Sequence, residues 1–127
     1  PLGAWRHGRL GDLIGEDVDG LGVCPGEGPA VDVAVSDGWR ELVAGTLDVA
    51  DPLPLWHQGT VDAEGSIDAA AAVDGRIVAW GATDPAADQN RLGLLFAEPL
   101  VRSPKGDPVY YEVVDEPDCR LRPLAGR

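Results

Sequence analysis

The sequence of 127 residues contains no methionine, one phenylalanine, one lysine and two histidines, and aromatic residues make up 6% of it. Long hydrophobic runs are also missing. No stretch approaches the roughly 18 apolar residues that a membrane helix requires, and the first residues lack the apolar run of a signal peptide. We therefore expect neither a membrane-spanning segment nor a secretory signal in this sequence.

Positive charge is scarce in the middle of the sequence. The formal net charge is −12, and residues 12–88 contain sixteen acidic residues against two arginines. Arg6 and Arg9 lie in the first eleven residues, and three more arginines lie in residues 119–127, where no acid occurs. Because an acidic body repels phosphate backbones, we expect no nucleic-acid partner. The basic ends either bind an acidic partner surface or are solvated tails.

Glycine and proline interrupt the sequence every few residues, with 17 glycines and 11 prolines. Such punctuation disfavours long helices and favours short strands joined by turns. We predict a mostly β protein, a small barrel or sandwich of six to eight short strands. Residues 1–30 hold eight glycines and are expected to form an extended arm. Residues 31–114 would form the β domain, and residues 115–127 an irregular C-terminal tail.

The strand predictions depend on alternating or β-branched residues between turn signals. The strongest turn signal is Asp74-Gly75, which suits a tight hairpin. Residues 39–47 are predicted to return along residues 31–35 as a second hairpin around Ser36-Asp37-Gly38. Residues 66–73 are alanine-rich, and either a strand or one helical turn fits them. The remaining predicted strands span residues 55–57, 59–63, 76–81, 92–96 and 109–114.

The two cysteines, Cys24 and Cys119, lie far apart in the sequence. They either form one disulfide that ties the N-terminal arm to the C-terminal tail or stay as two free thiols. Free thiols are the expectation for a cytosolic protein.

No catalytic or cofactor motif is recognisable. No serine lies in a Gly-x-Ser-x-Gly context, and nothing in the spacing supports a Cys24–His57 pair. Residues 16–20 faintly resemble a calcium loop but lack the required ligand positions, so a solvated acidic turn is the alternative. Zinc spacing and phosphate-binding loops are absent. We therefore expect no catalytic, cofactor or metal site and no enzymatic activity.

The four tryptophans are numerous for so few aromatic residues. Trp39 and Trp80 are predicted to lie in the core. Trp5 and Trp56 lie in the arm and in a proline-flanked loop, where a tryptophan anchors an interface, stacks on a sugar or closes one end of a barrel. The candidate partner-binding residues are Trp5, Arg6, Arg9, Leu13, Ile14, Trp56 and His57.

Residues 53–61, 73–82 and 92–96 together resemble the small β-rich head decoration proteins of tailed phages, through Leu53-Pro54-Leu55-Trp56, the Asp74-Gly75 hairpin and the run Leu92-Gly93-Leu94-Leu95-Phe96. The resemblance implies a structural protein that stabilises a capsid. Its partner would be the major capsid protein or another shell protein, bound through the arm and the β domain. Self-association, for example as a trimer, and a location on the virion surface would follow.

Two other hypotheses belong to different classes. One is a free-standing carbohydrate- or protein-binding module that uses exposed tryptophans and is cytoplasmic or secreted. The other is an enzyme that uses His57 with a nearby carboxylate or with Cys24.

Overall fold

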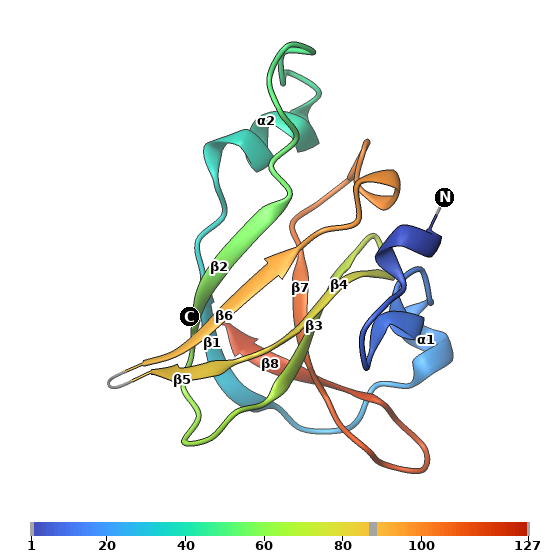
Figure 1. The fold of residues 1–127 in the computed structure, drawn as a ribbon, viewed down its shortest axis with the longest axis vertical. Coiled ribbons are helices and arrows are strands. Elements are labelled where there is room, and N and C mark those ends of the chain that lie inside the picture. The colour runs from blue at the N-terminus through green and yellow to red at the C-terminus, as the bar shows by residue number, and fades with distance from the viewer. Residues whose placement is uncertain (1, 87–88, 127) are drawn as a thin grey trace.

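The computed structural model describes residues 2–86 and 89–126. Its strands form a single eight-stranded sheet in the order β4-β3-β7-β8-β1-β2-β6-β5. The sheet curls into a nearly closed barrel, as Figure 1 shows. The strands are β1 (Gly28–Val33), β2 (Trp56–Val61), β3 (Asp68–Val73), β4 (Arg76–Ala82), β5 (Asp84–Ala86), β6 (Gln89–Leu95), β7 (Val109–Val113) and β8 (Leu121–Gly126). The expectation of a small, mostly β barrel is therefore confirmed.

Neighbouring strands pair antiparallel, except that β1 and β8 pair parallel. The helical elements are short: η1 (Gly3–Trp5), η2 (Gly11–Leu13), α1 (Val18–Leu21), α2 (Asp37–Ala44) and η3 (Glu98–Leu100). Within the described residues, no helix is long and apolar enough to cross a membrane.

The strand β3 has both faces buried, which explains its alanine-rich sequence. Ala69 and Ala71 face the barrel interior, where they pack in the core around Trp39 and Phe96. Ala70 and Ala72 face outward into a second apolar cluster. Because a strand covered on both sides reads as a continuous apolar run, the alternation that identifies a one-sided strand is absent. The structure selects the strand from the two alternatives left open for this segment.

The hairpin around Asp74-Gly75 is confirmed. Asp74 has φ 54° and Gly75 has φ 78°, and positive φ at both central residues is the requirement of the tight turn that matches strand twist. The strands on either side, β3 and β4, pair antiparallel up to Val73 and Arg76.

Residues 2–24 differ from the expected extended arm. They form η1, η2 and α1 and fold back onto the outer face of the sheet (Figure 1). The second apolar cluster explains this, because Leu13 and Ile14 are 1% and 3% exposed against β3, β4 and β8. The scattered apolar residues of this segment are therefore anchors onto its own domain.

The returning strand predicted for residues 39–47 is wrong. This segment forms α2, and β1 pairs with β2 and β8 instead. Ser36 begins the helix as its N-cap, since its Oγ accepts a hydrogen bond from the Trp39 N–H at 3.1 Å. Gly45 ends the helix with φ 75°, a left-handed conformation that glycine adopts without strain. Trp39 is fully buried as predicted.

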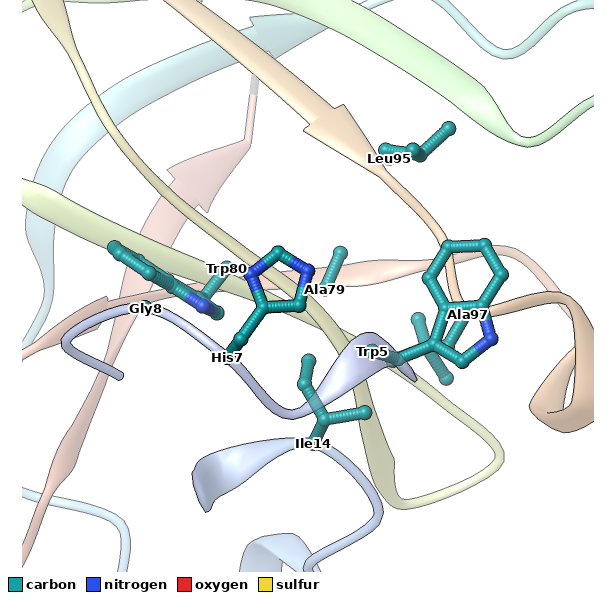
Figure 2. A pocket seen from close by; sticks show the side chains of 9 residues that line it. Trp5, His7, Gly8, Ile14, Ala79, Trp80, Leu95 and Ala97 are labelled. Atoms are coloured by element: carbon teal, nitrogen blue, oxygen red, sulfur yellow. The ribbon is translucent and has the colours of Figure 1, made fainter. Parts of the chain in front are cut away.

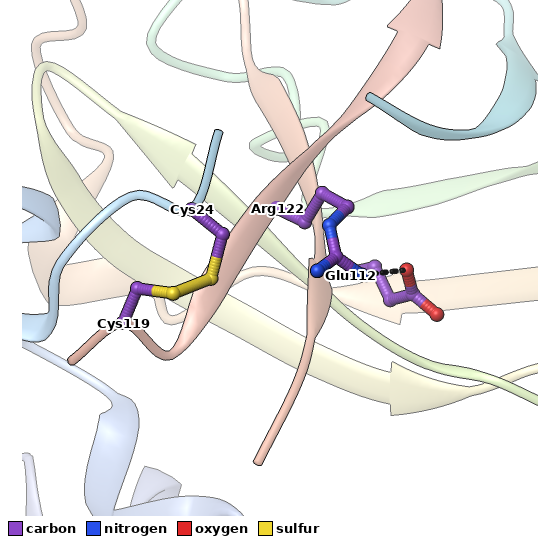
Figure 3. The surroundings of a disulfide bond; sticks show 4 residues. All are labelled: Cys24, Glu112, Cys119 and Arg122. Carbon is purple, nitrogen blue, oxygen red and sulfur yellow. Dashed lines mark ion pairs between the residues drawn. A yellow bond between two sulfur atoms is a disulfide. The ribbon is translucent and has the colours of Figure 1, made fainter. Parts of the chain in front are cut away.

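The C-terminal region is also more regular than the predicted tail of residues 115–127. Residues 121–126 form β8, an internal strand between β7 and β1. Of the two alternatives for the cysteines, the structure has the disulfide: Cys24 is bonded to Cys119, with their Cα atoms 5.2 Å apart (Figure 3). The free thiols expected for a cytosolic protein are therefore not what the structure shows, and the bond joins the end of the N-terminal segment to the loop before β8.

Candidate functional site

The main candidate site is an apolar hollow between the N-terminal segment and the outer face of β4 (Figure 2). Its volume is about 270 Å³. Two indole rings, an imidazole and a leucine side chain surround it, and we call it the aromatic cleft. Its lining residues are Trp5, His7, Gly8, Ile14, Val78, Ala79, Trp80, Leu95 and Ala97.

A bulge in β4 forms the floor of the aromatic cleft. Ala71 pairs with Ala79 and Ala72 pairs with Ile77, so Val78 is the extra residue on β4. The Val78 carbonyl is turned to another strand, where it accepts a hydrogen bond from the Ala97 N–H at 2.9 Å. This bond joins β4 to the chain that leaves β6, and it fixes the distance between the two sides of the cleft.

Two glycines bring β4 and β6 together beside this bond. A methyl group added at Gly81 would lie 2.9 Å from the carbonyl oxygen of Gly93. Larger residues at this crossing would separate the strands. The close approach places Trp80, from the outer face of β4, near Leu95, from the outer face of β6, as two sides of one hollow.

The N-terminal wall is attached to β4 through its backbone. The Gly15 N–H donates to the Ile77 carbonyl at 2.8 Å, and the Ile77 N–H donates to the Glu16 carbonyl at 2.9 Å. The Val18 N–H donates to the Gly75 carbonyl at 2.9 Å. β4 is an edge strand of the sheet. Residues 15–18 therefore satisfy backbone groups in the first half of β4 that would otherwise need other hydrogen-bond partners.

Trp80 is held between the wall and the sheet. Gly8 has φ 86°, and a methyl group there would lie 2.7 Å from Trp80 Cζ2. The Arg9 guanidinium lies 5.8 Å from the Trp80 ring centroid, which is within cation–π range. Arg9 Nη1 also donates to Asp68 Oδ2 at 2.9 Å. That hydrogen bond holds the pKa of the Asp68 carboxyl below its ordinary value.

The candidate partner-binding residues fall into two groups. Trp5, Arg6, Arg9 and Trp56 keep exposed surface, and Trp5 lines the aromatic cleft. Arg6 lines a separate hollow, where its Nη2 lies 3.0 Å from Glu16 Oε1. Leu13, Ile14 and His57 are buried. Of these three, Ile14 still lines the inner part of the aromatic cleft.

His57 is a core residue. Its ring stacks on Phe96 with centroids 3.8 Å apart and meets the edge of Trp39 at 5.2 Å. Its Nε2 donates to the Pro54 carbonyl at 3.0 Å. Burial lowers the pKa of the His57 imidazole, which favours the neutral ring in the folded protein.

The arrangement offers little for catalysis. The Cys24 sulfur is bonded to Cys119, so the considered Cys24–His57 pair has no free thiol. Among the residues that the structure describes, no group of three or more histidine, cysteine or acidic residues could hold a metal ion.

The sequence-based candidates include two of the nine residues that line the aromatic cleft, Trp5 and Ile14, and the two largest side chains that they omit are Trp80 and Leu95. Trp80 was expected in the core, but it is half-buried and lines the cleft, as does Leu95, which is 53% exposed. The exposure of Leu95 follows from the alternation of side chains along β6. Leu92 and Leu94 face the core and are buried, whereas Leu95 faces outward. The bulge at Val78 hides the equivalent signal in β4.

Comparison with known proteins identified no matching family model, no similar curated protein and no similar solved structure.

Proposed function

We propose that this protein is a non-enzymatic protein-binding domain that captures an apolar side chain of its partner in the aromatic cleft. The observation that carries the proposal is the cleft itself, a hollow between Trp5, Trp80 and Leu95. Tryptophans bury a large area at low entropic cost, and they dominate the energetics of protein interfaces.

The size and chemistry of the aromatic cleft support a side chain over a free metabolite. Its volume of about 270 Å³ lies just below the roughly 300–1,000 Å³ typical of small-molecule sites. Its lining is mainly apolar, with the His7 imidazole as the ionisable group among the lining residues. This apolar lining matches the chemistry of a leucine, methionine or aromatic side chain.

The framework around the aromatic cleft supports tight binding. The floor belongs to the barrel strand β4. Residues 15–18, directly after the wall, make two backbone hydrogen bonds to Ile77 of that strand and one to Gly75 in the turn before it. The disulfide at Cys24 further restrains the end of the wall segment. A site that is ordered before binding has less conformational entropy to lose when its partner arrives.

A shell protein would be one specific partner of this kind. The resemblance to capsid decoration proteins stays a prediction, and residues 2–24 packing on their own domain weakens the argument that this segment needs a shell to become ordered. The disulfide favours an oxidising location, such as a virion surface or an extracellular space, over the cytosol.

The proposal is tested with random peptides displayed on a carrier and selected on the immobilised protein. We expect the selected peptides to share one large apolar residue. The variant Leu95→Glu should weaken their binding by about tenfold or more, a loss of ~1.4 kcal/mol, because it places a carboxylate at the side of the cleft.

The matched control is Val109→Glu on β7. Val109 is 50% exposed and Leu95 is 53% exposed, so both variants add a charge at a half-exposed strand position. Binding should survive the control variant. Selection of no peptide, or equal losses in both variants, would contradict the proposal.

A further inference from the structure

The outer face of β2 and β6 carries an exposed tryptophan that rests on a glycine. Trp56 is 59% exposed. A methyl group added at Gly93 would lie 2.6 Å from Trp56 Cη2 and 2.8 Å from Cζ2. The six-membered ring of the indole therefore crosses from β2 to β6 over the Gly93 backbone, where a side chain would displace it. The surface of the ring that is not packed on the sheet is open to solvent.

Hydrogen-bonding side chains lie on the same face, next to this ring. Gln58 is the register partner of Gly93, and Thr60 is the register partner of Arg91. Gln58 and Arg91 are exposed. Together with Thr60 they line a shallow hollow of about 290 Å³. Because the ring lies over Gly93, Gln58 is directly beside it. Positions two apart on a strand are separated by roughly 7 Å, so Thr60 and Arg91 lie about one sugar ring farther along the two strands.

Two carboxylates extend this polar row across four strands. Asp32 of β1 pairs with Thr60, and Asp84 of β5 pairs with Arg91. Both aspartates are exposed, and register partners present their side chains on the same face of a sheet. Across the strands β1, β2, β6 and β5, the row therefore consists of the Asp32 carboxylate, the Thr60 hydroxyl, the Arg91 guanidinium and the Asp84 carboxylate.

We propose that the face formed by Trp56, Gln58, Thr60 and Arg91 is a binding site for a neutral saccharide. A pyranose ring has one face of C–H groups, and the negative face of an aromatic ring attracts such weakly positive hydrogens. Its hydroxyls both donate and accept. On the protein, the Gln58 amide and the Thr60 hydroxyl can also donate and accept hydrogen bonds. The Arg91 guanidinium donates, and the two aspartate carboxylates accept.

The charges select a neutral glycan over an anionic one. Arg91 is flanked on its row by Asp84, and the chain as a whole has a net charge of −12. A sulfated or uronic-acid glycan would meet this negative field, as would a nucleic acid. A neutral sugar meets no such penalty and uses both kinds of charged group as hydrogen-bond partners.

The experiment follows the four indole N–H signals of the ¹⁵N-labelled protein during titration with neutral oligosaccharides. The panel contains cello-, xylo-, malto-, manno- and N-acetylchito-oligosaccharides, with a sulfated oligosaccharide as the charged control. We expect at least one neutral sugar to cause a saturable shift of the Trp56 signal, with the buried Trp39 signal unchanged. The sulfated sugar should cause none.

Three variants test the geometry. Trp56→Ala should weaken binding of that sugar by roughly tenfold or more, in line with the loss of base–aromatic stacking at single-stranded nucleic-acid sites. Gly93→Ala keeps the indole but displaces it, so affinity should also fall. Trp56→Tyr should restore most of the binding, because it returns an aromatic face. Val109→Ala on β7 is the control and should leave binding unchanged.

The absence of a saturable shift with every neutral sugar at millimolar concentrations would overturn the proposal. Binding that survives Trp56→Ala, or preference for the sulfated sugar, would do the same. A peptide that moves only the Trp56 signal would identify this face as a protein-docking surface instead. Binding of a partner side chain in the aromatic cleft would instead shift the indole N–H signals of Trp5 and Trp80. The experiment therefore distinguishes a failure of the saccharide proposal from a failure of the proposed function.

Discussion

The disulfide between Cys24 and Cys119 allows the sharpest stability prediction. The two cysteines are 95 residues apart, so the bond closes a long loop in the unfolded chain. In the chain-entropy model, a loop of about 100 residues corresponds to a stabilisation of about 4.7 kcal/mol. We therefore expect the double variant Cys24→Ala/Cys119→Ala to lose roughly 3–5 kcal/mol of the free energy of unfolding.

This loss is a large part of the 5–15 kcal/mol that holds a typical domain folded. For a chain of this length, it corresponds to a fall in Tm of roughly 10–20 °C. The assay is thermal unfolding followed by circular dichroism, with urea unfolding to obtain the free energy. The oxidised wild type, the wild type reduced by dithiothreitol and the double variant are compared.

The reduced wild type should behave like the double variant, because both lack the restraint on the unfolded chain. Native β structure should persist in both, since Leu13 and Ile14 still anchor the N-terminal segment. A fall in Tm of less than about 3 °C in both samples would refute the reasoning. It would mean that the unfolded chain is already restrained or that the bond does not form.

Three further predictions concern single side chains. Leu13→Ala should lower the free energy of unfolding of the isolated protein by roughly 2–5 kcal/mol, because Leu13 is 1% exposed in its own domain. Urea unfolding measures this change. An unchanged free energy of unfolding would mean that residues 2–24 do not pack on the barrel. Ser36→Ala should lower the free energy of unfolding by about 1 kcal/mol, because it removes the N-cap of α2. Ser36→Asp should keep the wild-type stability, since aspartate also caps helices. Equal free energies of unfolding for the two variants would contradict the capping role. The pKa of His57 is lowered by burial, so the unfolded state binds its proton more readily; stability should be constant above about pH 6.5 and fall as the pH drops from there to 5. Urea midpoints at pH 7.5 and 5 should therefore differ in the wild type more than in His57→Phe, and equal pH dependence would exclude His57 as the cause.

The hairpin of β3 and β4 could be predicted because its signal is local. Asp74 and Gly75 are adjacent in the sequence, and the conformation that the turn requires depends on those two residues alone. The barrel class followed from the same kind of local punctuation. Local signals can also favour the wrong element. Ser36-Asp37-Gly38 fits a hairpin turn, and the residues around Trp39 fit a strand, but Ser36 is the N-cap that begins α2.

The strand β8 was missed for a different reason. Pro123 lies within it, and a proline argues against a central strand because it cannot donate to the ladder. The strand is nevertheless internal, paired with β7 on one side and β1 on the other. Its place depends on partners that are distant in the sequence, and no pattern within residues 121–126 reveals them.

The aromatic cleft could not be predicted from the sequence as a unit. Its wall comes from residues 5–14 and its floor from residues 78–97. Trp5 was recognised as a candidate by its isolation in a glycine-rich segment, but its neighbour Trp80 depends on a bulge that only the paired strands define. The same limit applies to Trp56, whose orientation depends on the absence of a side chain at Gly93 across the sheet.

The four tryptophans provide the most direct test of the proposed function. Each contributes one indole N–H signal, and their environments differ. Trp5 and Trp80 line the aromatic cleft, and Trp39 is buried. Trp56 lies outside the lining of the cleft, on β2 opposite Leu95. Titration of the ¹⁵N-labelled protein with a display-selected peptide should shift the Trp5 and Trp80 signals together and leave that of Trp39 in place. A peptide that binds without moving either Trp5 or Trp80 would contradict the account.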